Sequence, residues 1–429
     1  MFARFVRGVL VGLGSLAIHT VSATVGLVAL AIVATAISSP WVFLAAGLAV
    51  YIGTVSGLAW LVVRKSTGQR HVWLLATGVL TLLSVVGFSL TVLRPVSDPR
   101  SPPKSVAGLQ WWNLSDGARI GYTHTTPDRR GHRDPVVFLH GGPGVADLSG
   151  DTAYFGRLAA DGYDVYVYDQ LGTGHSSRLP DPSGYTLDRW VSDLEEIRRL
   201  IGADRMILIG HSWGTRIATR YLEQRPDHVS QLILSSPGAI PGSDDDSGAG
   251  LVDSLPEGDR KRVLSLIMHP RILVSYGLLQ INPEASRNFT PDAEMDARFD
   301  RVYNASRPAF HCSNLGSGRE LGGLGFYAYQ FPQSASAPID PDVRREVSKQ
   351  TLPTLIIKGQ CDYLSWTSAI EHVEALSDTT LVYLEDAGHN AYQDRPDVFM
   401  EVVRAFLQGD DVPMERHDIS VPDRYQGPP

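Results

Sequence analysis

Hydrophobic residues are distributed differently in the first hundred residues and in the rest of the chain. Residues 1–93 carry long apolar runs with almost no acidic side chains, whereas the later apolar runs are short and separated by polar or glycine-rich turns. About 20 apolar residues in a helix that rises 1.5 Å per residue can cross a hydrocarbon core of roughly 30 Å. We therefore expect three transmembrane helices, at residues 15–37, 41–63 and 71–93, with an early start possible for the first. A cleaved signal peptide would explain the first run alone, but that run is too long and two more follow it.

Basic residues flank the expected spans unevenly. They precede the first span and fill the gap between the second and the third, and the positive-inside rule places such segments in the cytoplasm. Three crossings leave the chain after residue 93 outside, so we expect a multi-pass cell-membrane protein with an extracytoplasmic catalytic domain. Three more basic residues beyond the third span weaken this orientation. In chain order these residues are Arg4 and Arg7, then Arg64, Lys65 and Arg70, then Arg94, Arg100 and Lys104.

From residue 109 onward, short apolar runs alternate with amphipathic helical patterns. This alternation predicts a mostly parallel sheet with helices on both faces, which is an α/β fold. The alternation stops between residues 235 and 351, where an inserted helical cap over the sheet is the expected reading. The expected domains are a membrane domain (1–94), a Pro-rich tether (95–107), two parts of the α/β core (108–238 and 351–409), a cap (239–350) and a disordered tail (410–429).

A short apolar run at residues 206–209 leads directly into Gly210-His-Ser-Trp-Gly214 and then into a helical pattern. A sharp strand-to-helix turn of this kind is a nucleophile elbow, in which the glycines allow the backbones to approach closely and the serine projects. Ser212 would stand at the N-terminus of the following helix, where negative charge is favoured. Ser212 is therefore the candidate nucleophile.

A serine hydroxyl needs a base to remove its proton and an acid to orient that base. In an α/β-hydrolase the acid and the histidine follow the serine, in loops after late strands. Asp362 and His389 occupy such places after the expected strands at residues 354–357 and 380–384. Asp386 and Asp394 are rival acids that lie nearer to His389 in sequence. We prefer Asp362, because the acid has to reach the imidazole from the loop of a neighbouring strand.

The oxyanion that forms during acyl transfer requires two hydrogen-bond donors. The N–H groups of Trp213 and of Gly142, in the glycine-rich loop at residues 140–144, are the candidates. The histidines in the motifs are expected to be structural, because they precede or adjoin the nucleophile and lack an acid in the expected order. They are His140, His175 and His211.

Composition narrows the classes of function further. The net charge of −8 and the lack of a Lys/Arg run argue against a nucleic-acid partner. The sequence contains neither a metal-binding cluster nor a phosphate-binding loop, so we expect no cofactor and no metal. Two cysteines, Cys312 and Cys361, leave open either a disulfide between cap and core or two buried thiols.

Three motifs together resemble the proline iminopeptidase family of α/β-hydrolases. They are His140-Gly-Gly-Pro-Gly144, Asp169-Gln-Leu-Gly-Thr-Gly-His-Ser176 and Gly210-His-Ser-Trp-Gly-Thr215, and the likeness runs from about residue 135 to 406. The resemblance implies a triad of Ser212, Asp362 and His389, and removal of N-terminal residues, often proline, from peptides, with cap acids that bind the free amino group. Two departures concern this specificity. Leu171 stands where the family usually has Arg, and the family's aromatic-plus-Glu cap signature is missing, so Glu320 is a candidate amine anchor or simply a solvated residue.

The sequence thus supports a membrane-anchored serine aminopeptidase that forms an acyl-enzyme, with a peptide substrate and a lipid bilayer around its N-terminal helices. A carboxylesterase or lipase-like hydrolase of small esters is the alternative, because fold and triad do not dictate the acyl group. A catalytically silent membrane receptor or scaffold is the alternative of another class. The sequence does not indicate an oligomeric state.

Overall fold

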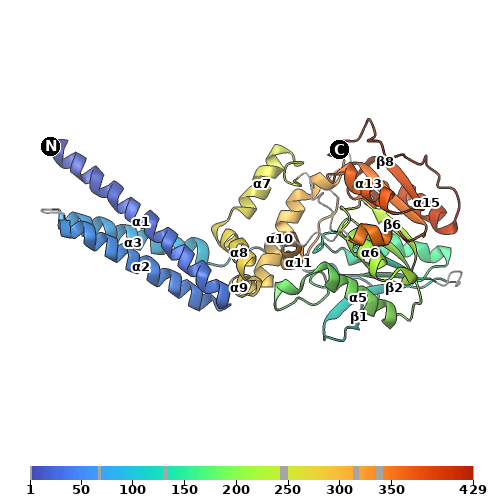
Figure 1. Cartoon of the computed structure of the whole chain (residues 1–429), viewed down its shortest axis with the longest axis horizontal. Helices are drawn as coiled ribbons and strands as arrows, with labels where there is room; N and C mark the ends of the chain where they lie inside the picture. The colour runs from blue at the N-terminus through green and yellow to red at the C-terminus, as the bar shows by residue number, and fades with distance from the viewer. Residues whose placement is uncertain are drawn as a thin grey trace. The chain divides into compact units, whose positions relative to one another are not determined.

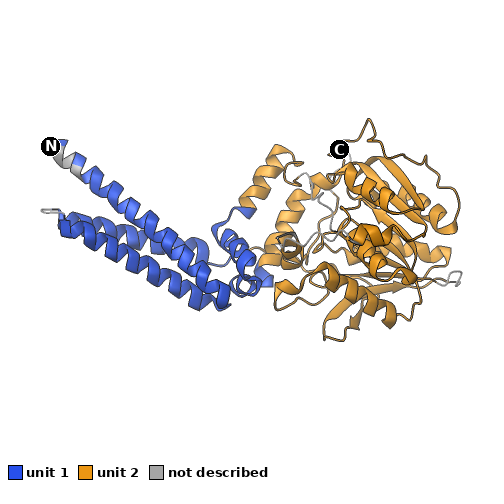
Figure 2. Cartoon of the chain, viewed as in Figure 1, with its two compact units in different colours: residues 1–97, 267–294 blue, residues 98–266, 295–429 orange. Residues whose placement is uncertain are grey.

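The structure is a computed structural model that describes residues 2–65, 69–128, 134–241, 250–312, 318–334 and 342–428. Its contacts divide the chain into two compact units (Figure 2). Unit 1 comprises residues 1–97 and 267–294, and unit 2 comprises residues 98–266 and 295–429.

Unit 1 contains three long apolar N-terminal helices, as the sequence predicts. They are α1 (Phe2–Ala36), α2 (Pro40–Lys65) and α3 (Arg70–Phe88), and a π-helical turn, η1 (Ser89–Leu93), continues α3. Each is long and apolar enough to cross a membrane. Helices α1 and α2 approach closely where Gly26 faces Gly47, since a Cβ atom on Gly26 would lie 3.0 Å from the Gly47 carbonyl oxygen. Small residues at such crossings allow close backbone packing between apolar helices.

Unit 1 also contains two short helices from the middle of the expected cap, α8 (Pro270–Ile281) and α9 (Pro283–Phe289). The cap predicted at residues 239–350 is therefore divided between the two units. The physical reason is that the apolar sides of α8 and α9 share a buried cluster with the N-terminal helices. This cluster comprises Leu30, Ala34, Phe43, Val92, Leu278, Ala285 and Phe289.

Unit 2 is built on one eight-stranded sheet with the strand order β1-β2-β4-β3-β5-β6-β7-β8 (Figure 1). Strand β2 is antiparallel to both of its neighbours, β1 and β4. All the remaining neighbouring pairs, from β4 through β3 to β8, are parallel. The mostly parallel sheet predicted from the sequence is therefore confirmed. The strands are β1 (Gln110–Asn113), β2 (Arg119–Thr125), β3 (Val136–Leu139), β4 (Val165–Tyr168), β5 (Met206–His211), β6 (Val229–Ser235), β7 (Thr354–Cys361) and β8 (Thr379–Gly388).

Helices cover both faces of this sheet. One face packs against α4 (Leu148–Phe155) and α15 (Pro396–Gln408) in the main core cluster, and α5 (Leu187–Leu200) and α6 (Trp213–Gln224) cover the other face. The remaining α-helices are α7 (Glu257–Ile267), α10 (Asp292–Ser306), α11 (Phe326–Ser334), α12 (Asp342–Val347), α13 (Trp366–Ala375) and α14 (Ala391–Asp394). Short 3-10 turns are η2 (Gly156–Asp161), η3 (Pro182–Gly184), η4 (Pro226–His228) and η5 (Arg307–Phe310).

The tail predicted to be disordered, residues 410–429, instead packs along the end of β7 as far as it is described. The N–H of Gln426 donates to the Gln360 carbonyl at 2.9 Å, and the Pro428 carbonyl accepts from the N–H of Trp366 at 2.9 Å. The Tyr425 ring lies 5.3 Å from the Trp366 ring. Charged and Pro-rich composition suggested a solvated segment, but one aromatic anchor and backbone hydrogen bonds are enough to order it.

Candidate active site

Ser212 occupies the tight turn between β5 and α6. Its backbone has φ 51° and ψ −117°, a left-handed conformation that non-glycine residues rarely adopt. A Cβ atom on Gly210 would lie 2.7 Å from the Gly214 carbonyl oxygen, and one on Gly214 would overlap the Leu139 carbonyl oxygen. The Ser212 N–H donates to the Ser235 carbonyl at 2.9 Å, which fixes the turn to β6. The strand-turn-helix geometry predicted for this serine is therefore present.

Asp362 and His389 meet at the ends of the last two strands. Nδ1 of His389 lies 2.7 Å from Oδ1 of Asp362, and both side chains are buried. The Ser236 hydroxyl donates to the His389 carbonyl at 2.7 Å and so holds the backbone of the histidine in place. The contact between Asp362 and Nδ1 of His389 orients the imidazole so that its other nitrogen, Nε2, is available for proton transfer.

The two rival acids make other contacts. Asp394 pairs with Nδ1 of His311 at 2.5 Å and accepts the N–H of Gly388 at 2.7 Å. Asp386 is exposed and lies 3.5 Å from Arg395. Of the three acids considered from the sequence, Asp362 is the one whose side chain contacts His389.

Tyr363 lies beside both His389 and Ser212. The rings of Tyr363 and His389 are 4.5 Å apart. Burial raises the pKa of Tyr363 well above its usual value, and a hydrogen bond with Ser212 opposes that rise. In the part of the chain that the structure describes, no direct hydrogen bond joins Ser212 to His389. Such bonds are often long in ligand-free enzymes and tighten when substrate binds.

Lys358 contacts the candidate acid and is not among the residues predicted from the sequence. Its Nζ atom lies 2.9 Å from Oδ2 of Asp362, and both side chains are completely buried. Nζ also donates to the Leu364 carbonyl at 3.1 Å, and the Leu364 N–H donates to Oδ1 of Asp362 at 3.1 Å. Burial alone would raise the pKa of Asp362, but the charge of Lys358 and the contact with His389 lower it below its usual value. The signal that could have revealed this pair is a lysine, Lys358, that directly follows a buried apolar run and lies four residues before Asp362.

The glycine-rich loop after β3 runs directly beside the serine. A Cβ atom on Gly141 would lie 3.0 Å from the Ser212 Cβ atom. Gly142 has φ 120° and precedes Pro143 through a cis peptide bond. Trp213 is the first residue of α6, so its N–H lies before the first intrahelical hydrogen bond. The two expected oxyanion donors thus belong to segments that flank Ser212.

The motif histidines support the loops around the site. His140 Nε2 accepts the Gln170 N–H at 2.9 Å, and His175 Nδ1 pairs with Asp169 at 2.8 Å. His211 Nε2 lies 3.2 Å from Oδ1 of Asn390. Burial, reinforced by His389, lowers the pKa of His211 to about 3, so this ring is neutral at physiological pH.

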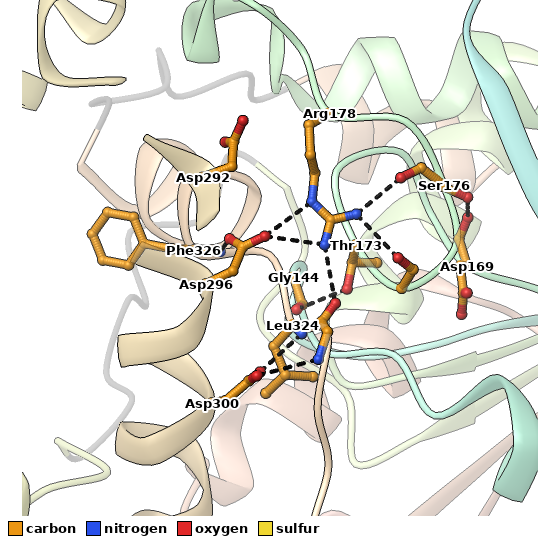
Figure 3. Close-up of polar contacts among 12 residues, drawn as sticks. Gly144, Asp169, Thr173, Ser176, Arg178, Asp292, Asp296, Asp300, Leu324 and Phe326 are labelled. Atoms are coloured by element: carbon orange, nitrogen blue, oxygen red, sulfur yellow. Dashed lines mark hydrogen bonds and ion pairs between the residues drawn. The ribbon is translucent and has the colours of Figure 1, made fainter. Parts of the chain in front are cut away.

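An arginine fastens the loop after β4 to the cap residues of unit 2 (Figure 3). The Arg178 guanidinium lies 3.2 Å from Oδ2 of Asp296 and donates to the Gly323 carbonyl at 3.0 Å. Asp300, one turn further along α10, accepts the N–H groups of Gly323 and Leu324 at 3.3 and 3.0 Å. These contacts fix the cap loop before α11 against the core.

Backbone atoms of the same cap loop contact the glycine-rich loop after β3 directly. The Gly144 carbonyl accepts from the Gly325 N–H at 2.8 Å and from the Thr173 hydroxyl at 3.0 Å. A Cβ atom on Gly325 would overlap the Gly172 carbonyl oxygen, so only glycine fits there. Three loops therefore meet at Gly144, two residues after Gly142.

A disulfide joins Cys312, directly after η5, to Cys361 beside the candidate acid, with the Cα atoms 5.2 Å apart. The neighbouring pair of His311 and Asp394 ties the same segment to α14. Two adjacent cap residues are thus bonded to the two loops that carry Asp362 and His389.

Replacement of Cys312 and Cys361 by serine is expected to lower the free energy of unfolding by about 2–4 kcal/mol, because the crosslink restricts the unfolded chain. Thermal unfolding with and without reductant is the measurement. Reductant should lower the Tm of the wild type and leave that of the double variant unchanged. An equal Tm for the wild type in both conditions would contradict a structural role for this bond.

Glu320 points to solvent. Its side chain is 77% exposed and lies 3.4 Å from Arg307. This position favours the solvated interpretation of Glu320 over that of an amine anchor.

A buried acid on α4 lies closer to the catalytic loops. Asp151 accepts a hydrogen bond from the Tyr392 hydroxyl at 3.0 Å, and burial together with Asp147 raises its pKa well above the usual value. The charges of both acids also act on Tyr303, which hydrogen-bonds Asn390, the residue after His389. Two acids therefore lie near the histidine loop, Asp147 paired with Arg319 and Asp151 hydrogen-bonded to Tyr392.

The chain is similar to known proteins in several respects, and the match to one family model agrees with this architecture. A family model described as the alpha/beta hydrolase fold matches residues 134–396. A proline iminopeptidase from Heyndrickxia coagulans is 41% identical over 121 residues, which cover 28% of this chain and 40% of that protein. One from Saccharolobus solfataricus is 28% identical over 290 residues, which cover 65% of this chain and 86% of that protein. The crystal structure of proline iminopeptidase from Mycobacterium smegmatis aligns with a TM-score of 0.48 and 22% identity, over 70% of this chain and 98% of that one.

Proposed function

The chain belongs to the alpha/beta hydrolase fold family, and on this premise we propose that it is a serine hydrolase with Ser212 as nucleophile, His389 as base and Asp362 as acid. The observation that carries the proposal is the buried contact of 2.7 Å between Asp362 and His389, next to a serine in a strained elbow. These are the parts that acyl transfer requires.

In the proposed mechanism, Nε2 of His389 takes the proton of Ser212 while Oγ attacks the substrate carbonyl. The N–H groups of Trp213 and Gly142 bind the resulting oxyanion, an effect of about 3 kcal/mol per donor. His389 then gives its proton to the leaving group, an acyl-enzyme remains, and a water activated by the same imidazole hydrolyses it. Asp362, held by Lys358, keeps Nδ1 protonated throughout, so that Nε2 is the nitrogen that takes up and releases the proton.

For the substrate we propose peptides with a free N-terminus, so that the enzyme acts as an aminopeptidase of the proline iminopeptidase type. The similarity to proteins named proline iminopeptidases supports this. Asp151 is a buried acid beside the histidine loop whose pKa is raised, and a substrate ammonium group would favour its ionised form. The exposed position of Glu320 and the buried Leu171 keep an esterase as the second candidate.

Paired substrates distinguish the two candidates. The full chain would be assayed with prolyl and alanyl amides, with the same amides after N-acetylation, and with short-chain p-nitrophenyl esters. An aminopeptidase should cleave the free-amine amides and lose nearly all activity on the acetylated ones, because the buried acid would face an uncharged group. Turnover of esters alone would refute the aminopeptidase and leave the serine hydrolase in place.

We further propose that α1, α2 and α3 anchor the enzyme in the cell membrane with unit 2 outside the cytoplasm. Their length and apolar composition, and the basic residues between α2 and α3, support this. Protease added to intact cells should digest unit 2. A unit 2 that stays protected until the membrane is opened would refute the orientation.

A further inference from the structure

Helix α8 is fixed to the N-terminal helices by a buried arginine. Arg271 donates to the carbonyls of Val92 and Phe289 at 2.9 and 2.7 Å and forms a bidentate pair with Glu294 at 2.6 and 2.9 Å. The Glu294 side chain also accepts the N–H of Val96 at 2.8 Å. A charge is costly to bury unless its hydrogen bonds are satisfied, and here every branch of the guanidinium has a partner. Helix α8 is therefore an integral part of unit 1.

Polar contacts of α9 identify the end of the helical bundle at which this segment lies. Asn282 donates to the Ala34 carbonyl at 2.8 Å, and the Ser38 hydroxyl donates to Glu284 at 2.9 Å. Ala34 lies in the last turn of α1 and Ser38 in the connection to α2, at the end opposite the basic α2–α3 connection. In Figure 2, α8 and α9 lie at one end of the bundle, in its colour. With the basic end in the cytoplasm, α8 lies at the outer leaflet.

The exposed side of α8 is mostly apolar and carries one polar residue, Gln280. Arg271 is the one charged residue in the helix, and it is buried. Leu273 and Ile281 are 42% and 40% exposed and lie eight residues apart, on one face with Gly277, and Met268 is exposed just before the helix. Trp41, exposed at the same end of the bundle, is a residue type enriched at membrane–water interfaces. The exposed side of α8 therefore carries no charged residue, and the same unit also exposes a tryptophan.

We propose that α8 is an interfacial membrane helix, whose face of Leu273, Gly277 and Ile281 inserts into the outer leaflet of the bilayer that α1–α3 span. The occupant is lipid, because this face continues the exposed apolar surface of the spans within the same compact unit. Burial to about 5–10 Å, at the boundary between headgroups and acyl chains, is typical of such helices. This inference rests on the proposed membrane anchoring and adds a contact made by the inserted cap segment.

Spin labels in the full chain test the proposal in nanodiscs of phosphatidylcholine and phosphatidylglycerol. The two native cysteines are paired, so single variants Leu273→Cys, Leu48→Cys and Leu200→Cys can be labelled without reductant. All three positions are exposed. Leu48 lies within α2, and Leu200 ends α5 in unit 2, where it serves as the aqueous control. The readout is the ratio of collisions with oxygen, which partitions into lipid, to collisions with a water-soluble nickel chelate.

At Leu273 we expect a ratio several-fold above that at Leu200 and below that at Leu48. A ratio at Leu273 equal to that at Leu200, with Leu48 in lipid, would overturn the inference and leave the anchoring intact. Protection of Leu273 from both reagents would also overturn it, because it would mean that a protein covers this face. An aqueous ratio at Leu48 would refute the anchoring and the inference together.

Discussion

Ser212→Ala is expected to lower kcat by about a millionfold, because removal of the nucleophile disables the serine, histidine and acid as a unit. The fold should persist, since alanine retains the Cβ atom and the Ser212 N–H that bonds Ser235. The measurements are turnover of the best amide or ester substrate and covalent labelling by a fluorophosphonate probe, both of which should fall to background.

Ser235→Ala is the matched control for this experiment. Ser235 is buried next to the elbow, and its hydroxyl makes no hydrogen bond among the residues that the structure describes. This variant should keep wild-type activity and labelling. If Ser212→Ala retained turnover or probe labelling, another residue would be the nucleophile and the proposed mechanism would fail.

Asp362→Asn is expected to lower kcat by about 10⁴-fold, because an amide cannot hold the histidine in the tautomer that accepts the serine proton. The same change should destabilise the protein by about 3–5 kcal/mol, since it leaves Lys358 buried without its counter-charge. Steady-state kinetics and denaturant unfolding measure the two effects separately.

The double variant Asp362→Asn with Lys358→Met separates stability from catalysis. Methionine removes the charge at nearly constant volume, so stability should recover while kcat stays low. Asp394→Asn provides a comparison, because Asp394 pairs with His311 and not with His389. Full activity in Asp362→Asn, with loss of activity in Asp394→Asn, would reassign the acid.

The sequence predicted those parts of the site that depend on local geometry. The elbow at Ser212 could be found because two glycines, a strand and a helix are adjacent in the chain. Asp362 could be chosen over Asp386 and Asp394 because strand order constrains which loops meet. Lys358 was missed, since its pairing becomes visible only when β7 and its following loop are folded together.

The sequence predicted a helical cap at residues 239–350 but not the partners of its helices in residues 267–294. An amphipathic pattern predicts which side of a helix is buried, but it does not identify the segment against which that side packs. The buried cluster with Phe43 and Val92, and the pairing of Arg271 with Glu294, depend on contacts that are distant in sequence. The ordered tail was missed for a similar reason, because Tyr425 finds Trp366 from almost sixty positions away.

The ties between the cap and the core in unit 2 have a consequence for inhibitor design. Three contacts hold the cap segment of unit 2 to the core. They are the ion pair of Arg178 with Asp296, the backbone hydrogen bond between Gly144 and Gly325, and the Cys312–Cys361 disulfide. These ties restrict the movement of the cap segment relative to the core, so we expect the site to change shape little when a ligand binds. Rigid inhibitors are therefore expected to suit it better than flexible ones, which lose more conformational freedom on binding.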